Sequence, residues 1–371
     1  MPVAVNGPRH DAGTRRRWPA PPSVLALATM LAACSSFGPS TVRNQQADYA
    51  SALAEAGKRQ TLLNILKLRY GDVPAFVSVS QILAGYSVQG TFSVGTELLS
   101  GNSLRLSDDA NVGIGGTFTN SPTVTYTPVT GASFARTFLA PLAPADLFGL
   151  MLAGVQPELV FGLGLHSIGG FDNERSGPGI HRAAGPGFDL VLRLLLSLQQ
   201  DGQLTIRLAV RDLQRVAWLK LEGGGNEGTQ AAARRLREML SLPPEQNVFE
   251  LVYTLDDAKP GQIGIRTRSL VEVLGQLAAD IDVPRSDVDE GRTYEALAVA
   301  DPLARFPGIN VRHGFLEPRD AFVSVNYDGD WFWIPNSDLG TKRVFSFVML
   351  LLSLSESSRP GQAPVISIPA G

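Results

Sequence analysis

The sequence predicts an α+β fold, in which a mixed or antiparallel sheet packs with helices and a long amphipathic β-hairpin is added. Three observations predict it. Segments with apolar residues at helical spacing are interspersed with short segments of strand-like period. Asp328-Gly329 lies between two alternating apolar runs, which is a strong hairpin signal. From Tyr86 a nearly unbroken period of two continues well beyond the usual strand length of about 5–6 residues.

The helices are predicted from apolar stripes and from the residues that end them. A helix is expected from Asp48, with an apolar stripe over Leu62–Leu68 and an end at Gly71. Helical spacing between Phe134 and Leu152 is broken by two prolines, so several short helices are expected there. The remaining expected helices are 188–199, 229–242, 268–281 and 341–355.

The strands are predicted from alternation and from flanking glycine, proline and aspartate residues. The expected extended segments are 159–168, 204–209, 248–255, 262–267, 321–326, 331–334 and 365–368. Segments 169–187 and 222–228 are rich in glycine and are expected to be loops. Segment 282–290 is acidic and contains proline, so we expect it on the surface.

A long hairpin is predicted at about 86–126. Apolar residues from Tyr86 to Leu98 and from Val112 to Tyr126 keep one parity, and small polar residues keep the other. Two interpretations stay open. The apolar side covers helices of the same domain, as in many antiparallel sheets with one wet face, or the arms are membrane strands that a ring of copies closes into a pore.

The only cysteine, Cys34, follows a segment with the order of a bacterial lipoprotein signal. Arginines at 15–17 are followed by an apolar segment at 24–33, and Leu-Ala-Ala-Cys ends it as a lipobox. Residues 1–33 are therefore predicted to be a signal peptide, and residues 34–46 a tether with the lipid on Cys34. Because no linker stands out, residues 47–371 are expected to form a single α+β body that includes the hairpin.

Charge and thiol content limit the function of the mature chain. Removing the four arginines and one aspartate of the first 33 residues leaves 28 basic and 34 acidic residues, a net charge of −6. This balance argues against a nucleic-acid partner, which requires a basic face. Once Cys34 carries lipid, no thiol is left for a disulfide or for catalysis. The longest apolar run, Val344–Leu354, has 11 residues, whereas a membrane-spanning helix needs about 20.

Ser133 is the one candidate nucleophile. It lies in Gly-Ala-Ser-Phe-Ala between an expected strand and helix, where a hydrolase nucleophile elbow would have glycine instead of Ala135. His166, His181 or His313 would have to act as the base. The competing interpretation is that Ser133 caps the helix that starts at the next residue, a position that serine favours.

No metal or cofactor is expected. The histidines lack ligand spacing, and the glycines match neither dinucleotide nor phosphate-binding loops. Asp328, Asp330, Asp338 and Lys342 gather near the C-terminal hairpin. We interpret Asp328 as a turn residue and Asp338 as an acceptor of backbone N–H groups at a helix start.

Several segments resemble a family of uncharacterised proteobacterial lipoproteins. The segments are Leu63–Asp72 with Pro74 and Phe76, Thr125–Pro128, Thr267–Leu270 and Trp333–Leu354. Glycines at 85 and 90 depart from the family pattern. The resemblance implies export and lipidation, and it implies no substrate or catalytic residue.

The leading hypothesis is a non-enzymatic lipoprotein of the cell envelope that binds or scaffolds a partner, because no titratable residues converge on one site. Ser35 after the lipidated cysteine resembles the sorting pattern of outer-membrane lipoproteins, so we expect the inner leaflet of the outer membrane, facing the periplasm. Expected partners are the membrane, through Cys34, and a protein or a second copy of the chain. A pore or secretion-type assembly built from hairpin 86–126 and a hydrolase using Ser133 are the alternatives.

Overall fold

The computed structural model describes residues 39–83, 86–95, 111–120, 123–177, 180–254, 258–279, 281–295 and 308–357. The chain divides into two units, residues 1–56 and residues 57–371, and all elements below except the first part of α2 belong to the second. Helices and mixed or antiparallel sheets make up the fold, so the predicted α+β class is confirmed. The expected signal peptide, Cys34 and the expected strand at 365–368 lie outside the described residues.

Helix α2 (Pro39–Arg69) begins earlier than the expected start at Asp48. Its apolar stripe is as predicted, since Leu62, Ile65 and Leu66 are completely buried. The helix ends before Gly71, whose φ of +78° is the left-handed conformation that favours glycine.

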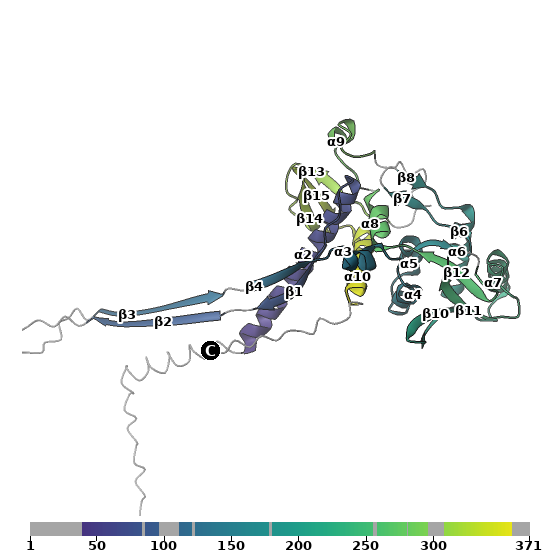
Figure 1. Ribbon diagram of the computed structural model, residues 1–371, viewed down its shortest axis with the longest axis horizontal. Coiled ribbons are helices and arrows are strands. Elements are labelled where there is room, and N and C mark those ends of the chain that lie inside the picture. The colour runs from purple at the N-terminus through teal and green to yellow at the C-terminus, as the bar shows by residue number, and fades with distance from the viewer. Residues whose placement is uncertain are drawn as a thin grey trace, which may run out of the picture. The chain divides into compact units, whose positions relative to one another are not determined.

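Two antiparallel ribbons follow α2 along the chain (Figure 1). β1 (Val77–Leu83) pairs with β4 (Thr123–Pro128), and β2 (Tyr86–Gly95) pairs with β3 (Asn111–Asn120). In the second ribbon the register places Val88 opposite Phe118. The sequence did not predict β1 as a strand. Side chains at 80–122 lie outside the described residues, so the environment of the hairpin's apolar side stays a prediction.

The largest sheet within the described residues has six strands (Figure 1). Its strands are, in spatial order, β6 (Phe171–Asp172), β5 (Leu165–Ile168), β12 (Gln262–Thr267), β11 (Val248–Tyr253), β10 (Gln214–Leu221) and β9 (Leu204–Arg211). Every pair is antiparallel except β11 and β12. One face is buried, through residues such as Leu219, Leu251 and Ile265, while Glu250 and Gln262 on the other face hydrogen-bond to each other.

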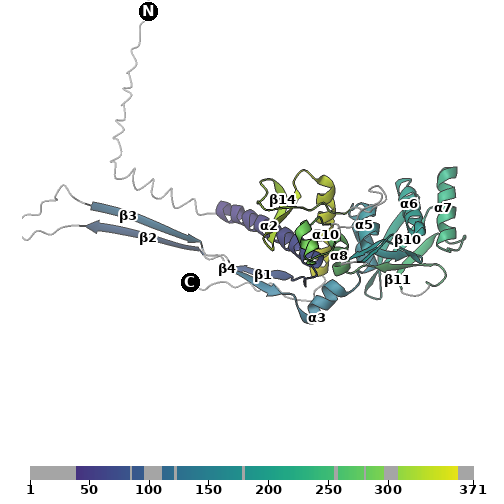
Figure 2. The ribbon, with the colours of Figure 1, turned by 90° about the horizontal axis from the view of Figure 1, so that it is seen from above.

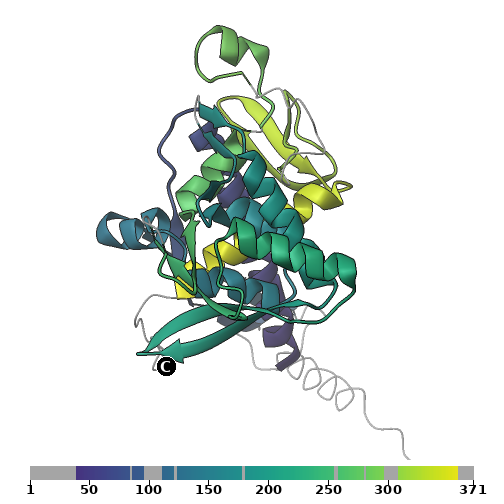
Figure 3. The same cartoon turned by 90° about the vertical axis from the view of Figure 1, so that its right-hand side faces the viewer.

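Five described helices precede or follow these strands along the chain. They are α4 (Pro144–Leu152), α5 (Pro157–Gly164), α6 (Pro186–Gln200), α7 (Glu227–Met239) and α8 (Leu270–Ala278). Helix α6 lies beside α7 and packs against β9, while α4 packs against β9 and β10 (Figures 2 and 3). A short ribbon of β7 (Arg175–Gly177) and β8 (Ile180–Arg182) lies within the glycine-rich segment that was predicted to be a loop.

The C-terminal part contains a second small sheet. Its strands are β13 (Arg312–Gly314), β15 (Asp330–Pro335) and β14 (Ala321–Tyr327), in spatial order. Asp328 and Gly329 turn between β14 and β15 with φ of +51° and +95°, so the predicted turn is confirmed. Helix α10 (Leu339–Ser357) follows, and Asp338 accepts the backbone N–H of Thr341 at 3.0 Å, which confirms the predicted helix-start role. The short helix α9 (Arg285–Asp289) lies in the acidic segment.

The extended segment predicted at 159–168 is wrong over its first half, which is helix α5. Pro157 occupies the first turn of α5 and Glu158 follows it, a favourable start for a helix. Gly164 permits close packing, because a Cβ there would lie 2.6 Å from the Leu147 side chain. Close packing of α5 against Leu147 therefore accommodates a glycine in this apolar helix. Strand β10 was also missed. Its turn from β9 has positive φ at Asp212 and Leu213, and leucine is not a typical residue for this conformation.

Candidate functional site

A groove of about 700 Å³ lies where β4 leads into the next helices. The chain passes from β4 into α3 (Gly131–Phe134) and a π-helical turn, η2 (Ala135–Leu139), before α4. The lining consists of Ser78, Thr127, Pro128, Val129, Thr130, Ser133, Arg136, Thr137, Ala140, Pro141, Leu142, Ala143, Asp146, Leu147, Leu351, Leu354 and Ser355. Single π-helical turns occur frequently at functional sites.

Three helix faces build the walls of this groove. Their lining residues are spaced three and four apart, which places each set on one side of its helix. The sets are 133, 136, 137 and 140 on α3 and η2, then 143, 146 and 147 at the start of α4, and 351, 354 and 355 near the end of α10. The wall is therefore made of regular structure, and its side chains are held by packed helices such as η2, where Phe138 stacks on Phe76 at 3.8 Å.

The groove has one uncompensated positive charge. Arg136 is exposed, and among the described residues no carboxylate pairs with it. Asp146 is the only carboxylate among the described lining residues, and it pairs with Arg215 at 3.0 Å. A ligand in the groove therefore meets a free guanidinium and a neutralised carboxylate.

Ser133 lines the groove, but neither sequence interpretation of it is supported by the structure. It lies inside α3, whose N-cap is Thr130, so the predicted capping role is wrong. The left-handed residue is Gly131, with φ of +59°, so Ser133 does not lie on the strained turn of a nucleophile elbow. The described lining contains no histidine to accept the proton of this hydroxyl.

The candidate histidines lie elsewhere or outside the described side chains. His166 lines a separate pocket of about 370 Å³ together with Arg266 and Ser269. Burial, followed by the nearby positive charges of Arg266 and Arg268, lowers the pKa of His166. His313 lies 3.6 Å from Asp282, and the side chain of His181 is not described. Of the two candidate histidines with described side chains, His166 and His313, neither lies in the described lining around Ser133.

The described residues contain neither a cluster of metal ligands nor a helix that could span a membrane. No group of three or more potential metal ligands comes together there. No helix in that part of the chain is long and apolar enough to cross a bilayer. Cys34, the predicted lipidation residue, lies outside the described residues.

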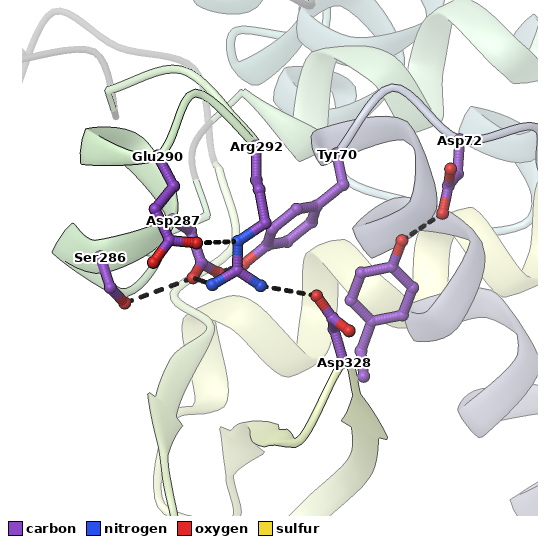
Figure 4. Close-up of polar contacts among 8 residues, drawn as sticks. Tyr70, Asp72, Ser286, Asp287, Glu290, Arg292 and Asp328 are labelled. Carbon is purple, nitrogen blue, oxygen red and sulfur yellow. Dashed lines mark hydrogen bonds and ion pairs between the residues drawn. The ribbon is translucent and has the colours of Figure 1, made fainter.

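A polar cluster joins the end of α2 to α9 and to the β14–β15 turn (Figure 4). The Tyr70 hydroxyl donates to Asp287 Oδ2 at 2.6 Å, and Arg292 Nη2 contacts Asp287 Oδ1 at 2.5 Å. Arg292 also pairs with Asp328 at 2.7 Å and with Glu290 at 3.1 Å.

The same cluster contains a second tyrosine–aspartate bond, from the Tyr327 hydroxyl to Asp72. Burial and then the hydrogen bond to Asp287 raise the pKa of Tyr70, and burial and the bond to Asp72 raise that of Tyr327. Both phenols therefore stay protonated at neutral pH and act as hydrogen-bond donors. These hydrogen bonds and ion pairs connect the end of α2 with α9 and with the β14–β15 turn.

Most of segment 282–290 is exposed or part-buried, as predicted, but the side chain of Asp287 is only 4% exposed. Its partners Tyr70 and Arg292 are 217 and 5 residues away in sequence. Tyr70 and Asp72 belong to the Leu63–Asp72 segment, and Asp328 was singled out as a turn residue; no sequence signal joined them into one cluster.

The Thr267–Leu270 segment has an equally structural role. Thr267 donates to the Leu142 carbonyl at 2.6 Å, and Arg268 donates to the Gly162 and Leu163 carbonyls at 2.7 and 3.2 Å. Ser269 forms a capping box with Glu272 at the start of α8. Residues of two segments that suggested the family resemblance thus stabilise the fold.

Comparison with family models, with curated proteins and with solved structures finds no match for this chain. The site is therefore interpreted from its own geometry. The groove offers a cation, hydroxyl groups and an apolar wall, whereas the Tyr70–Asp287 cluster is internally satisfied.

Proposed function

We propose that this chain is a lipid-anchored, non-enzymatic binding module of the cell envelope, and that the groove beside Ser133 is its binding site. The anchor rests on the lipobox that ends at Cys34. Ser35 favours the inner leaflet of the outer membrane as its location, with the body facing the periplasm.

The observation that carries the binding role is the composition of the groove. Ser133 has no base in the described lining, and Asp146 is engaged by Arg215. Catalysis by a serine requires a base within hydrogen-bond reach. The same lining provides the mixture of apolar surface and a few polar groups that is typical of ligand sites.

We expect Cys34→Ala to abolish incorporation of radiolabelled palmitate and to leave the full-length precursor unprocessed, because the thiol is the acceptor of the lipid. Membrane fractionation and autoradiography measure both effects. Ser36→Ala, which leaves the lipobox intact, is the control and should behave as the wild type. Labelling that persists in Cys34→Ala, or ester hydrolysis that is lost in Ser133→Ala, would contradict the proposal.

A second candidate function is assembly through the hairpin, and one observation favours it. β2 and β3 pair over ten residues each, and within the described residues no third strand pairs with either. A two-stranded hairpin is marginally stable in water by itself, and unpaired strand edges readily accept another strand. Copies of the chain would supply the missing neighbours.

Assembly through the hairpin predicts that the lipidated protein is oligomeric and conducts ions. Native mass measurement should give a multiple of the monomer mass, and planar or liposome conductance should rise when the protein is added. A strictly monomeric protein that leaves liposomes sealed removes this second candidate and leaves the binding module unaffected.

A further inference from the structure

The described lining of the groove is mainly polar on one side and has its exposed leucine surface on the other. Hydroxyl groups and the guanidinium come from the strand ends, α3 and η2, namely Ser78, Thr127, Thr130, Ser133, Arg136 and Thr137. Apolar surface comes mainly from Leu142 in the following segment and Leu354 on α10, which are both part-buried. Leu147 and Leu351 are each only 1% exposed, and Asp146 on α4 and Ser355 on α10 are polar. A ligand that fits this lining is itself polar at one side and apolar at the other.

The positive charge of Arg136 determines which kind of polar group the groove prefers. Arg136 has no carboxylate partner among the described residues, whereas Asp146 is paired at 3.0 Å with Arg215. A guanidinium presents several N–H donors in a planar fork that matches a carboxylate or phosphate. The groove therefore favours an anionic group over a neutral or cationic one.

The volume of the groove and the residues that line it narrow the chemical class of the ligand further. The groove of about 700 Å³ falls within the range of about 300–1,000 Å³ for small-molecule sites. Its described lining contains one cation and no aromatic side chain. A nucleotide would call for stacking surfaces and several cations, whereas a single acidic head on a hydrocarbon chain requires only what is present.

We infer that the groove binds a single-chain amphiphile with one anionic head group, of which a long-chain fatty acid is the simplest example. The head group lies against Arg136 and the neighbouring hydroxyls, and the hydrocarbon chain lies against Leu142 and Leu354. This assignment rests on the proposed function, because it specifies the ligand of the same groove.

The test is photo-crosslinking of the full chain in membranes from expressing cells, with a palmitic acid that carries a diazirine. Mass spectrometry of the digested protein locates the label, which we expect within 133–147 or 351–355. Unlabelled palmitate should displace the probe, whereas hexadecanol, which has the same chain and no charge, should require a concentration about tenfold higher.

Two variants tie the labelling to the groove. In Arg136→Gln the preference for palmitate over hexadecanol should disappear, while Arg319→Gln, an exposed arginine outside the groove, should retain it. Ala140→Trp places a large side chain at an exposed lining position and should abolish labelling, and Ala209→Trp on exposed β9 should not. Thermal midpoints measured by circular dichroism establish that each variant is folded.

Two results would overturn the assignment of an anionic amphiphile as the ligand: crosslinks distributed over the whole surface, or a preference for palmitate over hexadecanol that remains in folded Arg136→Gln. Neither result would contradict the proposal that the chain is a lipid-anchored binding module. The proposed function fails separately if methyl palmitate added to the same membranes is converted to palmitate by the wild type and not by Ser133→Ala. In that case, specific labelling of the groove with the expected preference for palmitate over hexadecanol would still support an anionic amphiphile as its ligand.

Discussion

Arg268→Met is expected to lower the free energy of unfolding of the full chain by about 3 kcal/mol, because several buried carbonyl groups lose their donor. Arg268 is 2% exposed. Its guanidinium donates to the carbonyls of Gly162, Leu163 and Glu174. Methionine has a similar length and fills the space, so the loss reports on the hydrogen bonds rather than on a cavity. Urea unfolding followed by circular dichroism measures it.

The position of these carbonyls explains why the effect is large. Gly162 and Leu163 belong to the last turn of α5, where helix carbonyls have no partner within the helix. Asn173 supports the same turn by donating to Gly162 at 2.9 Å and to Leu165 at 2.8 Å. Arg234→Gln on the exposed side of α7 is the control, with an expected change of about 0.5 kcal/mol or less. A loss below about 1 kcal/mol in Arg268→Met would refute this role.

Asp287→Asn is expected to lower the free energy of unfolding by about 3 kcal/mol, because Arg292 and Tyr70 lose a buried charged acceptor. Asparagine has the same shape, but its amide presents an N–H₂ group where one carboxylate oxygen accepted hydrogen bonds. The side chain of Asp287 is 4% exposed, and both of its oxygens have partners, at 2.6 Å and 2.5 Å. Thermal and urea unfolding both measure the change.

Glu290 provides the matched control, since it contacts the same guanidinium at 3.1 Å from a side chain that is 63% exposed. Solvent screens such a pair, so Glu290→Gln should cost about 0.5 kcal/mol or less. Equal effects of the two substitutions would mean that burial of Asp287 contributes nothing, which contradicts the account of this cluster.

Local signals predicted the parts of the fold that depend on a few neighbouring residues. The Asp328-Gly329 turn requires positive φ at both central residues, and Asp338 needs only the N–H of Thr341 three residues later. Period-two alternation likewise predicted β9 and β12 within a few residues.

Features that depend on tertiary packing were missed. Helix α5 has an apolar sequence that suits a strand equally well, and its helical form depends on Gly164 packing against Leu147. The start of α2 at Pro39 and the strand β1 had no clear periodicity. In such segments, contacts decide between structures that the local sequence permits equally.

The candidate site was likewise predicted only in part. Ser133 was singled out and does line the groove, but its neighbours differ from those that a hydrolase requires. No sequence pattern distinguishes Arg136. It was selected because, in the described structure, it has no carboxylate partner, whereas the nearby Asp146 is paired with Arg215. Asp287 was expected on the surface because its segment is acidic and contains proline, and its bond to Tyr70, 217 residues away, has no local sequence signal.

The central claim is that a lipid-bearing amino terminus holds a binding domain at the envelope, and the intact mass of protein extracted from membranes tests it most directly. The account predicts a chain of residues 34–371 with diacylglycerol on the thiol of Cys34. A mass that includes residues 1–33 with an unmodified thiol would contradict it.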